Sequence, residues 1–381
     1  MQAIGQRVRL GTLTGLLIGM TFLIPKTNTS AYQDTPSDTP SNSTAPSTAN
    51  PQHWDWGQLP RGLASPPKTP NETPLTKAQV ALGRRLFFDK GLSRDQTIAC
   101  VSCHQPNMAM ATNDRVAIGV EAKQGTRNSP SLLNVGYRTT LFWDGRASSL
   151  EEQALQPIEN PLEMDFSVDE VVNRLQANAS YVAAFQAAFD SEPSRESLAA
   201  ALAAFQRTLI AGDSPVDRFR EGDFSALTAP QRNGMWLFES RAGCWRCHSG
   251  PNFTDDRFHN TGVAWASEPR DLGRFLVTGE EADRGAFKTP GLRSVSRTAP
   301  YMHDGSMATL ADVVRFYNEG GIKNAHLDEV MKPLNLTDEE QRFLVAFLEA
   351  LDSELPTTAA AATQPDAPRP SAEDTQGDVR K

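Results

Sequence analysis

Two copies of the pattern Cys-x-x-Cys-His lie at residues 100–104 and 244–248, and they contain all four cysteines of the chain. This spacing is the attachment pattern of a c-type haem. Each thiol can add to a vinyl group of the porphyrin, and the histidine that follows lies under the iron as its proximal ligand. The sequence therefore predicts two covalently bound haem c groups. One is attached at Cys100 and Cys103 with His104 as iron ligand, and the other at Cys244 and Cys247 with His248.

Two alternatives would use the same cysteines without haem. The four thiols could form two disulfides, or they could bind one zinc ion, with the histidines accidental. Only six of the 381 residues are histidine, so its recurrence after both cysteine pairs favours haem.

Similar segments precede the two motifs. Leu75, Thr76, Gln79, Gly83 and Leu86 come before the first, and Leu227, Thr228, Gln231, Gly234 and Leu237 come before the second. Each threonine can cap a helix whose apolar side packs near its own haem. A repeat of this kind predicts two haem domains of related design, with a boundary near residues 212–226.

Helical periodicity dominates the remaining sequence. Ser167 with Glu170, and Thr337 with Glu340, are capping pairs in front of runs whose apolar residues recur at helical spacing. Strand-like alternation is rare. The predicted fold is mainly α, with two cytochrome c-like haem domains, at residues 57–215 and 216–355, and long loops.

The net charge is -9, from 37 basic and 46 acidic side chains. An acidic chain is a poor match for nucleic acid, because phosphate binding needs a basic face. A cationic electron-transfer protein would be the better electrostatic match.

The N-terminus has the pattern of an export signal. Arg7 and Arg9 precede a mostly apolar run at residues 10–24, which predicts a signal peptide over residues 1–25 or, if it is not cleaved, a membrane anchor. Residues 26–56 and 356–381 are rich in small, polar and proline residues and are predicted to be a disordered linker and tail. Export to the periplasm agrees with haem attachment, which takes place outside the inner membrane.

Four further segments resemble one family. Residues 127–130, 143–147, 153–164 and 298–305 are similar to segments of the bacterial di-haem cytochrome c peroxidases and their relative, the methylamine-utilisation protein MauG. With both haem motifs, the resemblance spans nearly all of residues 57–354.

The resemblance implies that the two haems divide the work. The first haem meets hydrogen peroxide, Glu163 and Gln153 form its polar distal side, and Pro157 shapes that side sterically. A carboxyl group near a haem is partly desolvated, which raises its pKa toward the range useful for proton transfer. Trp143 is expected between the haems, where its indole shortens the path for electrons.

The resemblance also implies a calcium ion near the domain interface. Asn128, Thr298 and Pro300 match the positions that bind it through side-chain and backbone oxygens, which are the ligands calcium prefers. His303 is expected near the haem propionates or the interface rather than on an iron.

Two departures bear on the branch of the family. Val120 stands where peroxidases that need reductive activation carry a blocking histidine, so the first haem is expected to be five-coordinate or water-bound. Tyr317 stands where many peroxidases have a methionine, as in MauG, and is the expected second ligand of the second haem. Met302, His326 and Met331 are the substitutes. A phenolate lowers the reduction potential of a haem, whereas methionine raises it.

The favoured function is reduction of hydrogen peroxide to water with electrons from a small cytochrome or a cupredoxin. One alternative is MauG-like oxidation of side chains in a partner protein, and another is a di-haem electron carrier without catalysis. Glu163 and the missing ligand at Val120 argue against the carrier, but they do not separate the first two. Members of the family are often dimers, although no homodimer interface can be read from the sequence.

Overall fold

The computed structural model describes residues 52–359, which belong to one compact unit. The predicted signal peptide, and most of the predicted linker and tail, lie outside the described residues. The helices are α1 (Lys77–Phe87), α2 (Cys100–Cys103), α3 (Leu150–Glu159), α4 (Val168–Gln176), α5 (Ala179–Phe189), α6 (Arg195–Arg207), α7 (Pro215–Arg220), α8 (Ala229–Glu239), α9 (Phe275–Thr278), α10 (Leu310–Asn318) and α11 (Asp338–Glu349).

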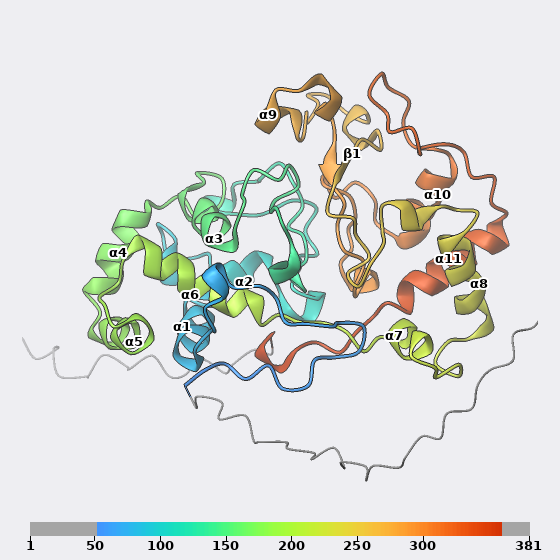
Figure 1. Cartoon of the computed structure of the whole chain (residues 1–381). Helices are drawn as coiled ribbons and strands as arrows, with labels where there is room; N and C mark the ends of the chain where they lie inside the picture. Colours follow the sequence, from blue (N-terminus) through green and yellow to red (C-terminus); the bar gives the residue numbers. More distant parts are fainter. Residues whose placement is uncertain (1–51, 360–381) are drawn as a thin grey trace, which may run out of the picture. The chain divides into compact units, whose positions relative to one another are not determined.

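Sheet is limited to one short pair in the described part of the chain. Strands β1 (Phe258–His259) and β2 (Phe287–Lys288) run antiparallel, with Phe258 opposite Lys288. The fold is mostly helical, as predicted (Figure 1). Within residues 52–359, no helix combines the length and the apolar character needed to cross a bilayer.

The predicted helix caps are confirmed in both halves. Thr76 and Gln79 form a capping box at the start of α1, and Thr228 and Gln231 form the same arrangement at the start of α8. Ser167 and Thr337 likewise cap α4 and α11. The long apolar run after Ser167 divides into α4 and α5, because α4 ends at Gln176 and Asn178 caps the next helix.

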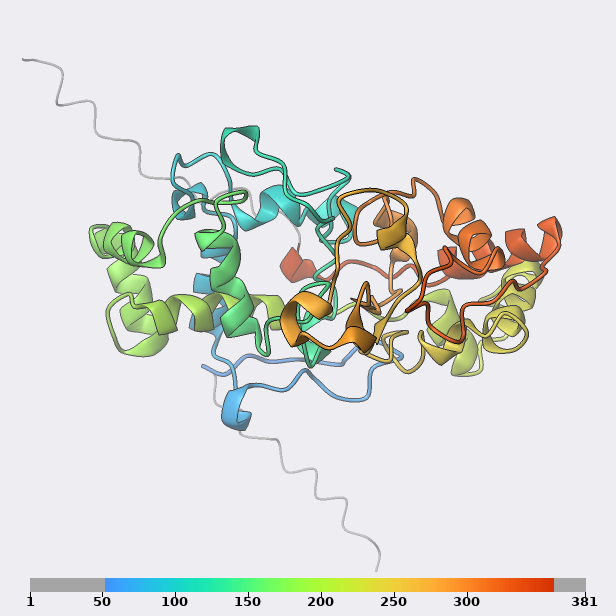
Figure 2. The same ribbon diagram turned by 90° about the horizontal axis from the view of Figure 1, so that it is seen from above.

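Each half contains a close helix crossing at an equivalent glycine. Helix α1 packs on α6 and α8 packs on α11, and the second pair lies side by side in both views (Figures 1 and 2). A β-carbon on Gly83 would lie 1.8 Å from the Ala201 carbonyl oxygen, and one on Gly234 would lie 1.9 Å from that of Phe343. The two glycines therefore permit the same backbone approach in both pairs.

Two separate hydrophobic clusters form the core. The first contains Phe87, Phe185 and Phe205, and in sequence its buried members end at Ala211. The second begins at Val216 and is centred on α8, α10 and α11. The change from one cluster to the other thus takes place within a few residues, just before α7.

Packed residues extend slightly beyond the predicted body at both ends. Trp54 and Trp56 pack against Leu75 and Val80, and the Trp54 amide donates to the Leu75 carbonyl at 2.7 Å. At the other end, the Thr358 hydroxyl donates to the Thr208 carbonyl at 3.2 Å. Aromatic and hydrogen-bond contacts thus continue for a few residues past the compositional shifts near residues 56 and 356.

A second repeat links residues that lie 160 positions apart. Asn134 and Ser294 share a left-handed φ of 58° and 57°, Phe142 and Met302 have 66° and 72°, and the following Gly145 and Gly305 have 69° and 62°. Each of these turns leads to a capped helix, α3 after Ser149 and α10 after Thr309. The two halves therefore present α3 and α10 in equivalent positions.

The repeated segments also exchange backbone hydrogen bonds. The Asn128 amide donates to the His303 carbonyl at 2.7 Å, and the Lys288 amide donates to the Trp143 carbonyl at 2.7 Å. Each turn is therefore held by the strand-like segment of the other half.

Candidate functional site

The first cysteine pair lies on the single turn of α2, and His104 follows directly. The His104 Nδ1 lies 3.1 Å from the Met110 carbonyl oxygen. A bond from Nδ1–H to a carbonyl leaves Nε2 unprotonated and free to bind a metal. Burial lowers the pKa of His104 to about 4, which keeps the imidazole neutral.

The second motif repeats this arrangement. Cys244 opens a short 3-10 turn, and the His248 Nδ1 lies 3.0 Å from the Phe253 carbonyl oxygen. Burial lowers the pKa of His248 as well. All four cysteines are free thiols, and in the described residues they do not gather into one metal-binding group. The orientation of both histidines thus fits two haem attachment sites.

A cavity of about 410 Å³ opens over the first motif. The predicted distal residues Gln153 and Pro157 reach it from α3, and Glu163 reaches it from the loop that follows. His104, Trp143 and the predicted calcium ligand Asn128 also line it. The structure therefore brings together all four residues that were predicted to be catalytic, beside the first proximal histidine.

Glu163 is held in a partly buried position. Its Oε1 accepts from the Asn160 side chain at 2.6 Å, and the Val120 amide donates to its backbone carbonyl at 2.8 Å. Burial raises the pKa of the Glu163 carboxyl, while Asn160 and the charge of Arg146 oppose the rise. The carboxyl group can therefore exchange a proton closer to neutral pH than an exposed glutamate can.

Val120 is fully buried and does not line this cavity. The hydrogen bond that its backbone N–H donates to the Glu163 carbonyl connects the two loops instead. His104 is the one histidine in the cavity lining, so in the described structure no second imidazole reaches the first site.

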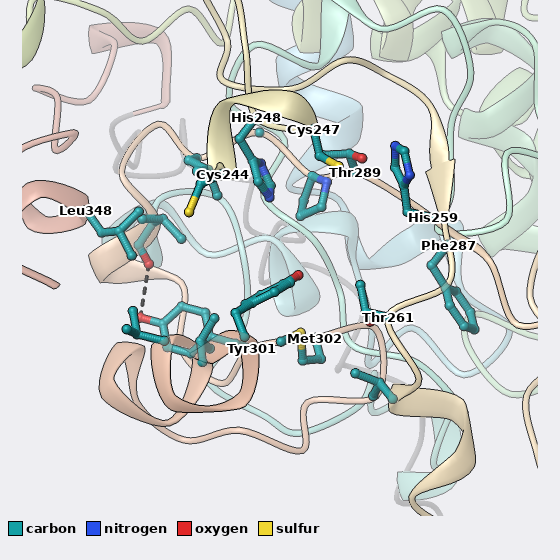
Figure 3. Close-up of a pocket in the computed structure, with 18 of the residues that line it drawn as sticks. Cys244, Cys247, His248, His259, Thr261, Phe287, Thr289, Tyr301, Met302 and Leu348 are labelled. Carbon is teal, nitrogen blue, oxygen red and sulfur yellow. Dashed lines mark hydrogen bonds between the residues drawn. The ribbon is translucent and has the colours of Figure 1, made fainter. Parts of the chain in front are cut away.

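A second cavity, of about 580 Å³, lies over the second motif. Figure 3 shows His248 on one wall and Tyr301 and Met302 on the facing side. Tyr317 on α10 also lines this cavity, and burial raises the pKa of its phenol well above the ordinary value.

Of the substitutes for Tyr317 as ligand, Met302 and Met331 line the same cavity. His326 does not line this cavity. Its Nε2 lies 3.9 Å from a carboxylate oxygen of Glu281 instead. Met302 and Met331 are therefore the two substitutes for Tyr317 that lie in the lining of the second cavity.

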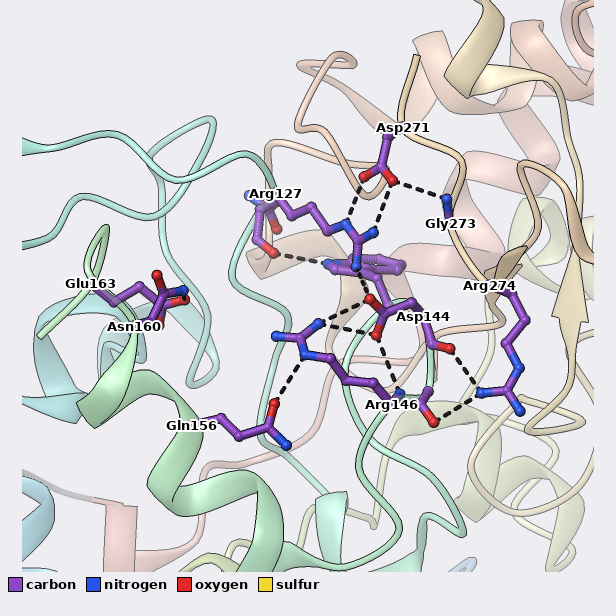
Figure 4. A network of polar contacts seen from close by, with 12 residues as sticks. Arg127, Asp144, Arg146, Gln156, Asn160, Glu163, Asp271, Gly273 and Arg274 are labelled. Carbon is purple, nitrogen blue, oxygen red and sulfur yellow. Dashed lines mark hydrogen bonds and ion pairs between the residues drawn. The ribbon is translucent and has the colours of Figure 1, made fainter. Parts of the chain in front are cut away.

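Trp143 lines both cavities. Its indole Nε1 donates to the Asn128 carbonyl at 2.8 Å. The next residue, Asp144, pairs with Arg127 at 2.6 Å and with Arg146 at 3.0 Å, and Arg127 continues to Asp271 at 2.6 Å (Figure 4). The indole thus lies in the wall between the two cavities, next to a chain of ion pairs that connects the two halves.

The predicted calcium residues meet at the edge of the second cavity. Asn128, Thr298 and Pro300 all line it. The side-chain nitrogen of Asn128 donates to the carbonyl oxygens of Asp114 and Arg115. Among the described residues, no group donates to Asn128 Oδ1 or to the carbonyl oxygens of Thr298 and Pro300, so three acceptors stay open.

His303 lies in the wall of the second cavity, 5% exposed, and its ring stacks on Phe287 with 3.5 Å between centroids. Burial lowers its pKa to about 4. This position at the junction of the halves agrees with the predicted place of His303 near the interface.

Sequence reasoning gave no role to His259. Its two ring nitrogens lie 2.5 Å from Asp328 and 2.8 Å from Asp255, next to Cys247. These partners come from separate loops, and only the four-residue spacing of Asp255 and His259 could have suggested the contact.

Comparisons with known proteins identify the family of the chain. The profile of the di-haem cytochrome c peroxidase family matches residues 77–225. The chain is 42% identical over 314 residues to the methylamine utilization protein MauG of Methylorubrum extorquens, which covers 81% of this chain and 89% of that protein. It is 37% identical over 323 residues to the cytochrome-c peroxidase IdrP1 of Denitromonas iodatirespirans, covering 77% and 86%.

Among solved structures, a MauG-like protein associated with microbial copper homeostasis matches with a TM-score of 0.74 and 34% identity, covering 81% of this chain and 97% of that one. The chain therefore belongs to the di-haem cytochrome c peroxidase and MauG family. It is a haem-dependent oxidoreductase of the peroxidase class, and the family implies two haem c groups.

Proposed function

We propose that this enzyme reduces hydrogen peroxide to water at the haem of the first motif, with electrons that enter through the haem of the second. The observation that carries the proposal is the first cavity, which combines a proximal histidine with an acid-base group and has no other histidine in its described lining. A haem iron with an open face supplies peroxide binding and redox chemistry.

Glu163 would move the proton of bound peroxide from the inner to the outer oxygen. Its partial burial and raised pKa suit a group that must take up and release a proton in one cycle. Gln153 would orient the peroxide through its amide, and Pro157 would keep the space above His104 free of ligating atoms. The hydrogen bond that the Asn160 side chain donates to Glu163 would hold the carboxyl group in place.

Trp143 would carry electrons between the haems, because it lines both cavities. Tyr317 would bind the second iron as a phenolate, since it lines the cavity of His248 and has no hydrogen-bond partner among the described residues. Tyr317→Met should raise the potential of the second haem and change its absorption spectrum. An unchanged spectrum would assign the ligand to Met302 or Met331.

MauG-like oxidation of a partner protein is a second candidate. It is favoured by the 42% identity to MauG and by a tyrosine at the second site, because a phenolate stabilises oxidised iron. Oxidation of a protein would use the same peroxide site but would need no reduced donor.

Steady-state turnover of hydrogen peroxide, with and without a reduced small cytochrome or cupredoxin, separates the candidates. Fast turnover that depends on the donor supports the peroxidase. Slow turnover together with oxidised side chains in a partner supports the MauG-like activity.

Electron paramagnetic resonance of the ferric protein should show one high-spin and one low-spin haem. Two low-spin signals, together with no reaction with peroxide, would exclude both catalytic functions and support the di-haem electron carrier.

Several features of the whole protein extend the proposal. We infer two haem domains, residues 57–215 and 216–355, from the two hydrophobic clusters and the repeated helix crossings. We also infer a calcium ion bound by Asn128, Thr298 and Pro300, supported by their open oxygen acceptors at the second cavity. Export to the periplasm follows from the sequence of residues 1–25 and from the chemistry of haem attachment. A homodimer remains a proposal from the family resemblance.

A further inference from the structure

One buried positive charge in the wall of the first cavity lacks a close partner. The Arg138 side chain is 12% exposed and lines this cavity. Its nearest carboxylate oxygen is Asp256 Oδ1, at 3.9 Å from NH1, which is too long for a hydrogen bond. Among the described residues, the Arg138 guanidinium has no hydrogen-bond acceptor.

Asp256 is already occupied by other donors. Its Oδ1 pairs with the Lys288 ammonium group, which is 9% exposed, and its Oδ2 accepts from the Thr139 amide at 2.7 Å and hydroxyl at 2.5 Å. One carboxylate therefore faces two buried cations. The cluster of Arg138, Lys288 and Asp256 carries a net charge of about +1 next to the cavity.

The three other arginines in the cavity lining differ from Arg138. Arg127 pairs with Asp271 and Asp144, Arg146 pairs with Asp144, and Arg293 pairs with Asp217 at 2.7 Å. Arg138 alone among them donates no hydrogen bond to a described residue.

Burial of a guanidinium that donates no hydrogen bond is costly, because its N–H groups lose their hydration without an acceptor in return. That cost is visible in the pKa of Arg138, which burial lowers and Asp256 only partly restores. An anion placed in the cavity would remove the cost. The planar fork of five N–H donors on arginine is suited to a carboxylate.

We propose that Arg138, assisted by Lys288, binds a propionate of the haem attached to Cys100 and Cys103. A porphyrin on this motif extends from His104 into the cavity that Arg138 lines, and its propionates are the carboxylates it brings there. The equivalent position in the second half, 160 residues later, is the neutral Thr298, so Arg138 has no charged counterpart at that position. The inference rests on the proposed function only in placing the first haem in this cavity.

The experiment compares Arg138→Met, which removes the charge at similar length, with Arg138→Lys, which keeps it. Arg195→Met is the control, because Arg195 forms an exposed ion pair with Glu159 and lines neither cavity. Two readouts are taken on the haem-loaded protein: the midpoint potential of the high-spin haem, and the propionate bending bands in its resonance Raman spectrum.

Loss of a nearby positive charge disfavours the reduced haem. Arg138→Met should lower the reduction equilibrium constant of the first haem about tenfold, or about 59 mV for one electron. Its propionate band should shift, whereas the second haem should keep its potential. Arg138→Lys should restore most of the potential but not the band, since an ammonium group does not form the bidentate pair. Arg195→Met should change neither.

Unchanged potential and unchanged propionate bands in Arg138→Met would overturn the inference. If that variant does not take up haem, the Raman band of Arg138→Lys decides, and an unshifted band overturns the inference. Peroxide turnover of the unmodified protein is measured in parallel. A protein without turnover whose Arg138 variants still shift the band would refute the proposed function and leave the propionate site intact.

Discussion

The two cavities are built from equivalent elements but differ in the side chains that line them. Helices α3 and α10 start from equivalent turns, and at the same step along them stand Pro157 in the first half and Tyr317 in the second. Each lines its own cavity. A proline side chain has no atom that can bind iron, whereas a phenol has one. A single position in a repeated framework can therefore separate an open haem from a closed one.

The same comparison applies to Gln153 and Trp143. Gln153 on α3 corresponds to the apolar Val313 on α10, and Trp143 corresponds to His303. The first half thus has polar distal groups and the indole in the wall, and the second has an apolar helix face and a stacked imidazole. The two halves thus share backbone turns and helix starts, while the side chains that line their cavities differ.

The largest expected effect comes from making the two halves alike. Pro157→Tyr places a phenol where Tyr317 stands in the other half, so the first haem should lose its high-spin signal and its reaction with peroxide. Electron paramagnetic resonance and stopped-flow absorbance measure both. Pro157→Ala is the matched control and should keep the open site. A high-spin signal that persists in Pro157→Tyr would show that the equivalence of α3 and α10 does not extend to the iron.

Removal of the acid-base group should have the next largest effect. Glu163→Gln should slow the reaction with peroxide by roughly 100-fold, because the amide cannot accept the proton. Since burial raises the pKa of Glu163, the carboxyl of the parent protein loses its proton above the ordinary range near 4.5. The rate of the parent should therefore rise as the pH increases through that raised pKa, and the rise should be absent from Glu163→Gln. A pH profile with the same rise in both proteins would assign the proton transfer to another group.

The two helix crossings provide a test of structural equivalence. Gly83→Ala and Gly234→Ala should each lower the free energy of unfolding by about 2 kcal/mol, because the added methyl group meets a backbone carbonyl. Denaturant unfolding of the haem-loaded protein measures the loss. Gly125→Ala is the control, since its new β-carbon would lie 3.3 Å from that of Ala117. Equal stability of all three variants would mean that the crossings relax freely.

The smallest expected effect concerns the bridge. Trp143→Phe keeps an aromatic ring in the shared wall but removes the donor to the Asn128 carbonyl. Electron transfer from the second haem to the first should slow, while the initial reaction with peroxide should change little. Rapid mixing of the reduced protein with peroxide follows the two haem spectra separately. If Trp143→Phe transfers electrons at the rate of the parent protein, the electrons follow a path through other atoms of the wall.

Local signals in the sequence were sufficient for the haem motifs and for the helix starts. Thr76 and Thr228 cap their helices because a capping box needs only residues three apart. Glu163, Gln153, Pro157 and Trp143 were grouped by resemblance to a family, and the structure places them around one cavity. Their roles stay predictions.

Contacts between distant segments could not be predicted. The pairing of Arg127 with Asp271 spans 144 residues and depends on how the halves meet. The packing of Trp54 on Leu75 was hidden by a polar neighbourhood that resembles a linker. The 160-residue repeat is visible in Asp144-Gly145 and Asp304-Gly305, but most of the residues around these pairs differ between the two copies and obscured it.

The crossed backbone bonds from Asn128 to His303 and from Lys288 to Trp143 have a consequence for attempts to dissect the protein. A fragment that stops at residue 215 would retain the tryptophan yet lack the amide that holds its carbonyl, and the complementary fragment would lose the donor to its imidazole turn. Neither fragment contains the donor of the hydrogen bond that holds its own turn. A first fragment expressed alone should therefore bind haem but should not hold the Trp143 indole in a fixed orientation. Addition of the second fragment should restore that orientation.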